Sequence, residues 1–252
     1  MKKILVYILF SVTSLNLFSG NLQPMVDSAQ DLYMQSRYSE ALTWYDSINN
    51  MGYSSSDLYY NMANCYFRMN DVPNSVYYYE KSLMLDPSNK DAVYNLAIAN
   101  QMLKQNIEPV QNSFSDRVNT SIMTFMSTDA WAITSLIFFI FILGGIAMYL
   151  FLNPIVLRKI GFSVAVVALV FFVFTAIYAY KSSKLITENK YAVVFEQSMV
   201  KTSPNADAVN SFELYEGVKV MVSDSANGKY NIRLADGKEG WIDINNVKIL
   251  AK

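Results

Sequence analysis

Residues 56–89 read SDLYYNMANCYFRMNDVPNSVYYYEKSLMLDPSN, and this stretch predicts two helices that pack on each other. A close approach of two helices needs small side chains where they meet and bulky side chains beside them. A proline just after the second helix cannot continue it. The residues at these positions are Ala63, Ser75 and Ser82 at the contact, Tyr66 and Tyr79 beside it, and Pro87 at the end.

The pattern recurs at an offset of 34 residues, at which Ala29, Ala63 and Ala97 align. A period of 34 is typical of tetratricopeptide repeats, which are stacked helix pairs. We therefore predict an α-helical tetratricopeptide solenoid over residues 21–105. It has about two and a half repeats, because the third keeps only its first helix, from residue 90 to about residue 104.

The first helices of stacked repeats line a concave groove, and here the groove positions are aromatic and nearly uncharged. Aromatic residues are enriched at interfaces, so this set is a candidate partner-binding surface. They also fill cores, so packing between helices is the alternative for each tyrosine. No Lys or Arg falls at a groove position, which leaves a clamp for a peptide carboxylate unsupported. The predicted groove residues are Tyr33, Tyr60, Asn64, Phe67, Tyr94, Ile98 and Gln101.

The composition of the chain is typical of a membrane protein. Of its 252 residues, 52% are hydrophobic and only 16% are charged, against roughly 25% charged in an average soluble domain. Two uncharged apolar runs cover residues 130–152 and 160–180, and a bilayer core takes about 20 residues to cross. They predict a transmembrane hairpin whose connecting loop carries Arg158 and Lys159, which favour the cytoplasm.

Residues 1–20 combine a basic start, a short apolar run and small residues, which predicts a secretory signal peptide. An uncleaved anchor is the alternative, because the residue three positions before the expected cleavage site is large, whereas signal peptides typically have a small residue there. Either one exports the segment that follows. We therefore predict a multidomain protein of the bacterial inner membrane, with the parts on both sides of the hairpin in the periplasm.

Residues 106–129 link the repeats to the first span. Phe114, Val118 and Ile122 recur there at helical spacing, with polar residues between them. This pattern predicts an amphipathic juxtamembrane helix that lies on the membrane surface and contacts membrane lipid.

Residues 190–252 change to short alternating runs separated by turn signals such as Asn227-Gly228. Five short strands of this kind predict an all-β SH3-like barrel. The stretch RLADGKEGW at residues 233–241 resembles the bacterial SH3 family. That resemblance implies that three residues contact cell-wall peptides. For the two aromatic residues among them, the alternative is that they fill the core, because a small domain has few large side chains. The implied contacts are Ser203, Tyr230 and Trp241.

Catalysis is not expected. The chain has no histidine and a single cysteine, Cys65, which excludes Ser-His-Asp and Cys-His catalysis, His-bearing zinc sites and intrachain disulfides. A net charge of −1 gives no general attraction to nucleic acid. We predict a non-enzymatic protein without a cofactor, a metal or a nucleic-acid partner.

The order of signal peptide, repeats, membrane hairpin and SH3-like domain resembles the Bacteroides aerotolerance (Bat) family, and STDAWA at residues 127–132 is similar to the membrane junction of that family. The resemblance implies von Willebrand A-domain membrane proteins as partners and a role in oxidative stress tolerance. The predicted function is a membrane-anchored scaffold that binds partner proteins through the groove and the barrel. A peptidoglycan-binding envelope sensor or adaptor is the alternative.

Overall fold

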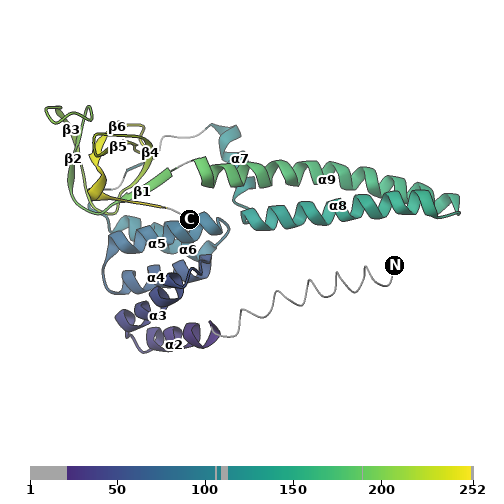
Figure 1. The fold of residues 1–252 in the computed structure, drawn as a ribbon, viewed down its shortest axis with the longest axis horizontal. Coiled ribbons are helices and arrows are strands. Elements are labelled where there is room, and N and C mark those ends of the chain that lie inside the picture. The colour runs from purple at the N-terminus through teal and green to yellow at the C-terminus, as the bar shows by residue number, and fades with distance from the viewer. Residues whose placement is uncertain (1–21, 106, 109–112, 189, 251–252) are drawn as a thin grey trace.

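The computed structural model describes residues 22–105, 107–108, 113–188 and 190–250, and the predicted signal peptide lies outside these ranges. The repeat helices and an antiparallel sheet lie together at one end of the molecule (Figure 1). Two long helices extend away from them side by side.

Five helices, α2 to α6, form the repeat region. Side-chain caps fix where the last three of them begin, because Ser55, Asp71 and Asn89 each accept a hydrogen bond from the backbone N–H three residues later. A cap of this kind is worth about 1 kcal/mol. The helices are α2 (Gln23–Met34), α3 (Tyr38–Asn50), α4 (Ser56–Arg68), α5 (Val72–Leu85) and α6 (Lys90–Gln101).

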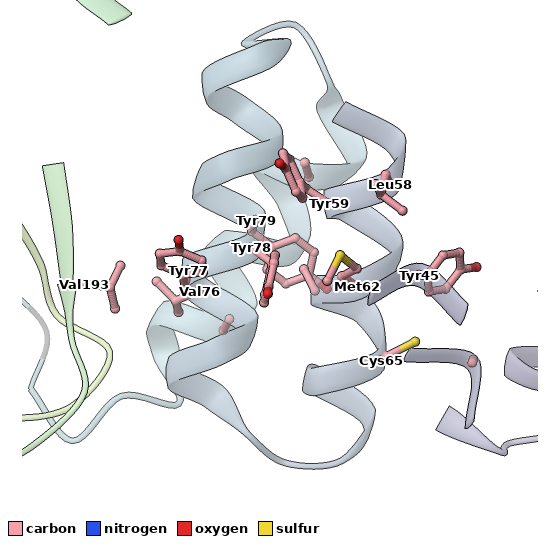
Figure 2. Close-up of a cluster of buried hydrophobic side chains, with 14 of the residues drawn as sticks. Tyr45, Leu58, Tyr59, Met62, Cys65, Val76, Tyr77, Tyr78, Tyr79 and Val193 are labelled. Atoms are coloured by element: carbon pink, nitrogen blue, oxygen red, sulfur yellow. The ribbon is translucent and has the colours of Figure 1, made fainter. Parts of the chain in front are cut away.

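A tyrosine-rich core joins α4 to α5 (Figure 2). Ala63 on α4 and Ser75 and Ser82 on α5 are fully buried, which is the close contact that the sequence predicts. Because these small side chains let the two helices approach, Tyr79 is completely enclosed beside them. An aromatic side chain buries about 150–250 Å², so the rings of this core contribute strongly to the stability of the helix pair.

The two long helices are α8 (Thr128–Phe151) and α9 (Ile155–Glu188), and each contains an apolar stretch long enough to cross a membrane. The sequence prediction that Arg158 and Lys159 lie in the connecting loop is wrong, since both belong to the first two turns of α9. Pro154 immediately precedes α9 and starts it early, because its fixed φ suits the beginning of a helix.

The hairpin is held by close contact between helix backbones. A Cβ atom on Gly145 would lie 2.6 Å from the carbonyl oxygen of Gly161, and a Cβ on Gly161 would lie 2.7 Å from that of Gly145. Near the other end of the hairpin, Thr128 Oγ1 and Ser182 Oγ share a hydrogen bond of 2.6 Å. Between apolar helices in lipid, such close packing and hydrogen bonding supply the attraction that the hydrophobic effect supplies in water.

A shorter helix, α7 (Phe114–Met123), precedes α8, and the sheet follows α9. All strand pairs in the sheet are antiparallel, in the order β3-β2-β6-β5-β4-β1-β7. Asn227 and Gly228 form the turn between β4 and β5 with φ values of 52° and 74°, which a two-residue hairpin turn requires. The strands are β1 (Lys190–Val194), β2 (Ser198–Lys201), β3 (Asn210–Leu214), β4 (Lys219–Ala226), β5 (Lys229–Arg233), β6 (Glu239–Asp243) and β7 (Val247–Ile249).

The expectation of five strands is wrong, because the sheet has seven. The sequence analysis misses β3 and β7. β7 has only three residues, and β3 contains Asn, Ser and Glu, so neither shows an apolar alternation of useful length. Pairing with β2 and β1 makes them strands.

The sheet lies against the second helices of the repeats. Lys219 at the start of β4 forms an ion pair of 2.6 Å with Glu80 on α5. The Tyr77 hydroxyl, also on α5, donates a hydrogen bond to the carbonyl oxygen of Ile249 at 3.3 Å, and its ring meets that of Phe195 edge to face, with centroids 5.9 Å apart. The repeats and the sheet therefore share a polar and aromatic interface along α5.

The glycine contact in the hairpin gives a matched pair of variants. We expect Gly145→Leu to destabilise the protein by about 1–3 kcal/mol, the usual cost of overpacking, because the added side chain meets the backbone of α9. Gly144→Leu should have little effect, since nothing lies within 4 Å of a Cβ at that position. Thermal unfolding in detergent, followed by near-ultraviolet circular dichroism, compares them. Equal shifts in melting temperature would contradict this packing.

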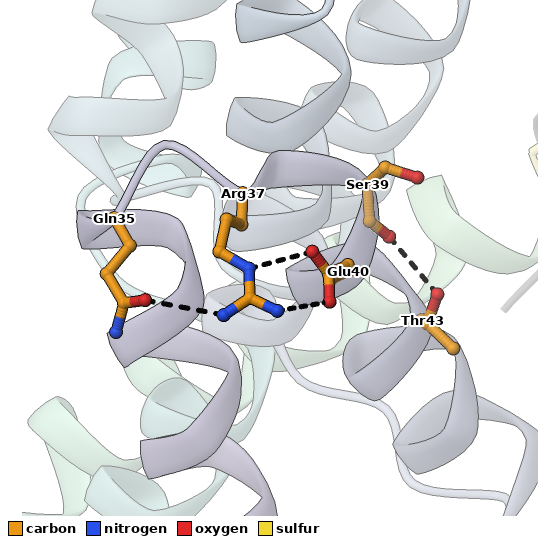
Figure 3. Close-up of polar contacts among 5 residues, drawn as sticks. All are labelled: Gln35, Arg37, Ser39, Glu40 and Thr43. Atoms are coloured by element: carbon orange, nitrogen blue, oxygen red, sulfur yellow. Dashed lines mark hydrogen bonds and ion pairs between the residues drawn. The ribbon is translucent and has the colours of Figure 1, made fainter.

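The ion pair at the interface gives a second prediction. Lys219→Met should lower the free energy of unfolding by about 1–3 kcal/mol, because it leaves the buried Glu80 carboxylate without its partner. Adding Glu80→Met should restore part of the loss. The matched control is Arg37→Met, which removes the exposed pair with Glu40 (Figure 3) and should change stability little. Denaturant titration of the wild type and the three variants measures these differences. If Arg37→Met were as destabilised as Lys219→Met, the result would argue against the interface.

Candidate functional site

Four of the predicted groove residues lie on α2 and α4, the first helices of the pairs α2–α3 and α4–α5. Tyr60, Asn64 and Phe67 follow one another at helical spacing on α4, so they share one face. Tyr33 comes from the last turn of α2. All four side chains are half-buried, so each packs on a neighbour and still presents part of its surface.

A hydrogen-bond network fixes the centre of this face. The amide oxygen of Asn64 accepts hydrogen bonds from the Tyr79 hydroxyl at 2.5 Å and from Nδ2 of Asn95 at 3.1 Å. Asn95 also donates to the Tyr60 hydroxyl at 3.2 Å. Burial raises the pKa of Tyr79, so its hydroxyl stays protonated and donates. Tyr60 and Asn64 therefore contribute to packing between helices as well as to the surface.

Arg68, which is not among the predicted groove residues, places a cation beside Tyr33 on this face. Arg68 is exposed, and its Nε lies 3.5 Å from the Tyr33 hydroxyl, which raises the pKa of the guanidinium. It follows Asn64 by four residues, so the helical spacing alone could have placed the two together. Within the described residues, the Nδ2 group of Asn64 has no acceptor.

We call the surface formed by Tyr33, Tyr60, Asn64, Phe67 and Arg68 the α2–α4 face. It combines aromatic rings with one positive charge and one free amide donor. Guanidinium and amide donors bind carboxylate and carbonyl oxygens. This arrangement suits an extended peptide segment with apolar side chains and an acidic group.

The other three predicted groove residues lie on α6 and are arranged differently. Tyr94 is 67% exposed and lines a separate cleft with Phe125, outside the repeats. Ile98 is half-buried and Gln101 is exposed. The structure thus brings four of the seven residues together and directs Tyr94 elsewhere.

The implied ligand contacts in the sheet do not form one site. Tyr230 pairs with Ile242, which is buried, so Tyr230 faces the core of the sheet. Trp241 pairs with Asn231 and Lys201. Since successive side chains in a strand point to opposite faces, Trp241 lies on the outer face. Of the two aromatic residues, Tyr230 therefore belongs to the core of the sheet and Trp241 does not. Ser203 lies just after the end of β2.

The single thiol is not available for chemistry. Cys65 is fully buried in the core of the repeats, and this burial raises the pKa of its thiol to about 12. It is therefore protonated at neutral pH, and a thiol reacts as the thiolate. In the described part of the chain, no cluster of three or more His, Cys, Asp or Glu side chains could hold a metal ion.

Comparison with known families identifies the helix pair at the centre of the molecule. The tetratricopeptide repeat family matches residues 56–89, which contain α4, α5 and the turn that follows. No curated protein matches the chain. Residues 56–89 are thus a tetratricopeptide repeat, a fold that generally binds protein partners and is not itself enzymatic.

Proposed function

We propose that this protein is a non-enzymatic membrane-anchored scaffold and that the α2–α4 face binds a segment of a partner protein. One observation carries the proposal. The sheet contacts α5 through Glu80 and Tyr77, whereas on the α2–α4 face Arg68 is exposed and the other four side chains keep part of their surface exposed. A repeat that is covered on one side and open on the other has one long surface left for a partner.

The chemistry of that surface indicates the kind of segment it takes. Half-buried rings of Tyr33 and Phe67 offer apolar contact with little loss of conformational freedom. Arg68 and the free amide donor of Asn64 offer directional hydrogen bonds to an acidic group. The segment we expect therefore carries apolar side chains and a carboxylate.

The resemblance to the Bat family supports membrane-anchored von Willebrand A-domain proteins as the partners, and oxidative stress tolerance as the process. The buried thiol of Cys65 indicates that this chain would serve that process by binding rather than by redox chemistry. We assign the sheet to the SH3-like barrels, which its antiparallel hairpins support, and we expect it to hold the repeats in place.

The membrane arrangement follows from the two long helices. Both are apolar enough to cross a bilayer, and Arg158 and Lys159 are the fourth and fifth residues of α9, shortly after the turn between the helices. Positive charge favours the cytoplasmic side. We therefore place this turn in the cytoplasm and both the repeats and the sheet in the periplasm, at the outer face of the inner membrane.

A second candidate function is a peptidoglycan-binding sensor or adaptor. The observation in its favour is Trp241, which lies half-buried on the outer face of the sheet opposite Lys201. An aromatic ring beside a polar cross-strand neighbour offers a small platform for a wall peptide.

Photocrosslinking in living cells separates the two candidates. With p-benzoylphenylalanine at position 67, we expect adducts to a membrane-anchored protein that contains a von Willebrand A domain. Arg68→Ala should lower the yield about tenfold, because a hydrogen bond to a charged group contributes about 1.5–3 kcal/mol. The control position is Trp44 on α3, which is 39% exposed and lies outside the α2–α4 face. Equal yields at positions 67 and 44 would refute the scaffold proposal, and wall-peptide adducts at position 241 alone would favour the second candidate.

Topology can be tested independently of any partner. A membrane-impermeant lysine reagent applied to spheroplasts should label Lys90 at the start of α6 and Lys238 just before β6, and should spare Lys159. Mass spectrometry of the purified chain locates the label. Labelled Lys90 together with protected Lys238 would mean that only one of the two helices crosses the membrane.

A further inference from the structure

Among the described residues, no second helix packs on α6, the last helix of the repeat region, in the way that α5 packs on α4. At the 34-residue offset, Val93 and Ala97 on α6 correspond to Tyr59 and Ala63 on α4. On α4 these positions are covered by α5, so that Tyr59 is 4% exposed and Ala63 is 0% exposed. On α6 Val93 is 51% exposed, and Ala97 is exposed as well. The face that a second helix should cover is therefore open.

This open face is apolar, which is unusual for the end of a repeat array. Terminal repeats normally carry a polar outer face, because no further repeat covers them. Here the outer face of α6 presents Val93, Tyr94 and Ala97. Apolar surface of this kind, placed together, marks an interaction site.

A cleft of about 720 Å³ lies beside this face. One wall consists of the start of α6 and the side chains of Val93, Tyr94 and Ala97. The opposite wall consists of Thr124 and Phe125, which follow α7, and Phe125 is itself 72% exposed. The cleft is mainly apolar, although Ser88 and Thr124 also line it and Lys90 is the one charged residue among those that line it.

The cleft lies at the height where the chain enters the membrane. Phe125 stands two residues before Ser127, which caps α8. On the other side of the hairpin, Lys181 Nζ donates a hydrogen bond to Oδ1 of Asn119 on α7 at 3.3 Å, close to where the apolar stretch of α9 ends at Lys184. α7 runs across α9 at this level (Figure 1). Whatever fills the cleft must therefore reach it at the bilayer surface.

The chain contains a helix of suitable chemistry at that height, namely α7. Phe114 and Val118 stand four residues apart on one side of it and are 75% and 43% exposed. Ile122, one turn further on, is half-buried, so the chain itself leaves the first two turns of the apolar side of α7 exposed. All copies of the protein enter the membrane in the same orientation, so α7 of a second copy lies at the level of the cleft.

We propose that α7 of a second copy of this chain docks in the cleft between α6 and Phe125, where it serves as the missing second helix of the third repeat. The exchange is reciprocal and gives a dimer with a two-fold axis along the membrane normal, since a two-fold interface uses the same patch on both subunits. The proposal rests on α8 and α9 crossing the membrane. It is independent of the partner that binds the α2–α4 face.

Disulfide trapping between two tagged chains tests the proposal. One chain carries Val93→Cys and the other Val118→Cys, and both are co-expressed and oxidised in native membranes. Cys65 stays in place, because it is buried and the pKa of its thiol is raised to about 12. We expect a mixed disulfide dimer. The matched control replaces Val118→Cys with Arg117→Cys, which turns the thiol about 100° around the helix and should form no mixed dimer.

The dimer dissociation constant in lipid nanodiscs, measured by mass photometry, is the second readout. Val93→Asp should raise it tenfold or more, because tenfold corresponds to about 1.4 kcal/mol and burying an unpaired carboxylate costs more. Met34→Asp, at a position that is 79% exposed on α2, should leave it unchanged. Circular dichroism confirms that both variants are folded.

Two outcomes would overturn the proposal. In the first, a single chain that carries both Val93→Cys and Val118→Cys forms an intramolecular disulfide, and the two singly substituted chains form no mixed dimer. That result would mean that α7 fills the cleft of its own chain. Alternatively, the protein could stay monomeric at every concentration with no disulfide of either kind, which would leave the cleft to lipid or to another protein.

Discussion

The arrangement of the molecule depends on the close contact between α4 and α5. Ala63, Ser75 and Ser82 have no exposed surface, so the two helices approach closely enough to enclose Tyr79. The Tyr79 hydroxyl then reaches Asn64 and fixes one face of α4. The opposite side of α5 presents Tyr77 and Glu80 to the sheet. A bulky side chain at Ala63 would separate the helices and disturb both surfaces, because each is defined by the position of α5 relative to α4.

The sheet is attached to the rest of the chain in several places, which limits how far it can move. The 34-residue helix α9 leads from the turn of the hairpin to the start of β1. α5 holds the sheet through the Glu80 ion pair, and Leu103, just beyond α6, lies against Gly217, where a Cβ would find no room. A stiff helix and two lateral contacts constrain a body more than a flexible linker would. These contacts hold the repeats and the sheet in a fixed arrangement relative to each other.

The two candidate surfaces of the repeats differ in a way that suits different roles. The α2–α4 face carries a guanidinium, an amide donor and half-buried rings, so it can recognise a specific peptide by directional hydrogen bonds. The cleft beside α6 is mainly apolar and lies next to the segment that joins α7 to α8. Apolar surfaces of this kind favour permanent association. A protein with both could assemble with its own copies through one surface and bind partners through the other.

Features that depend on local pattern could be predicted from the sequence. The 34-residue period and the small residues at Ala63, Ser75 and Ser82 predicted the helix pair that the tetratricopeptide repeat family matches. The apolar runs predicted two helices long enough to span a membrane, because span length depends only on the number of apolar residues and the rise per residue. The turn at Asn227-Gly228 could also be predicted from the sequence, since few residue pairs accept two positive φ angles.

Contacts between residues far apart in the sequence became known only from the three-dimensional structure. Arg68 reaches Tyr33 across 35 residues, and Lys219 reaches Glu80 across 139 residues, contacts for which no local pattern exists. The same holds for Gly145 and Gly161, because a helix periodicity does not say which face meets the neighbouring helix. Strand register, set by pairing, put Tyr230 and Trp241 on opposite faces. The tendency of a segment to form a helix or a strand depends on its own residues. These contacts depend instead on how the segments pack, and packing is determined by all the segments together.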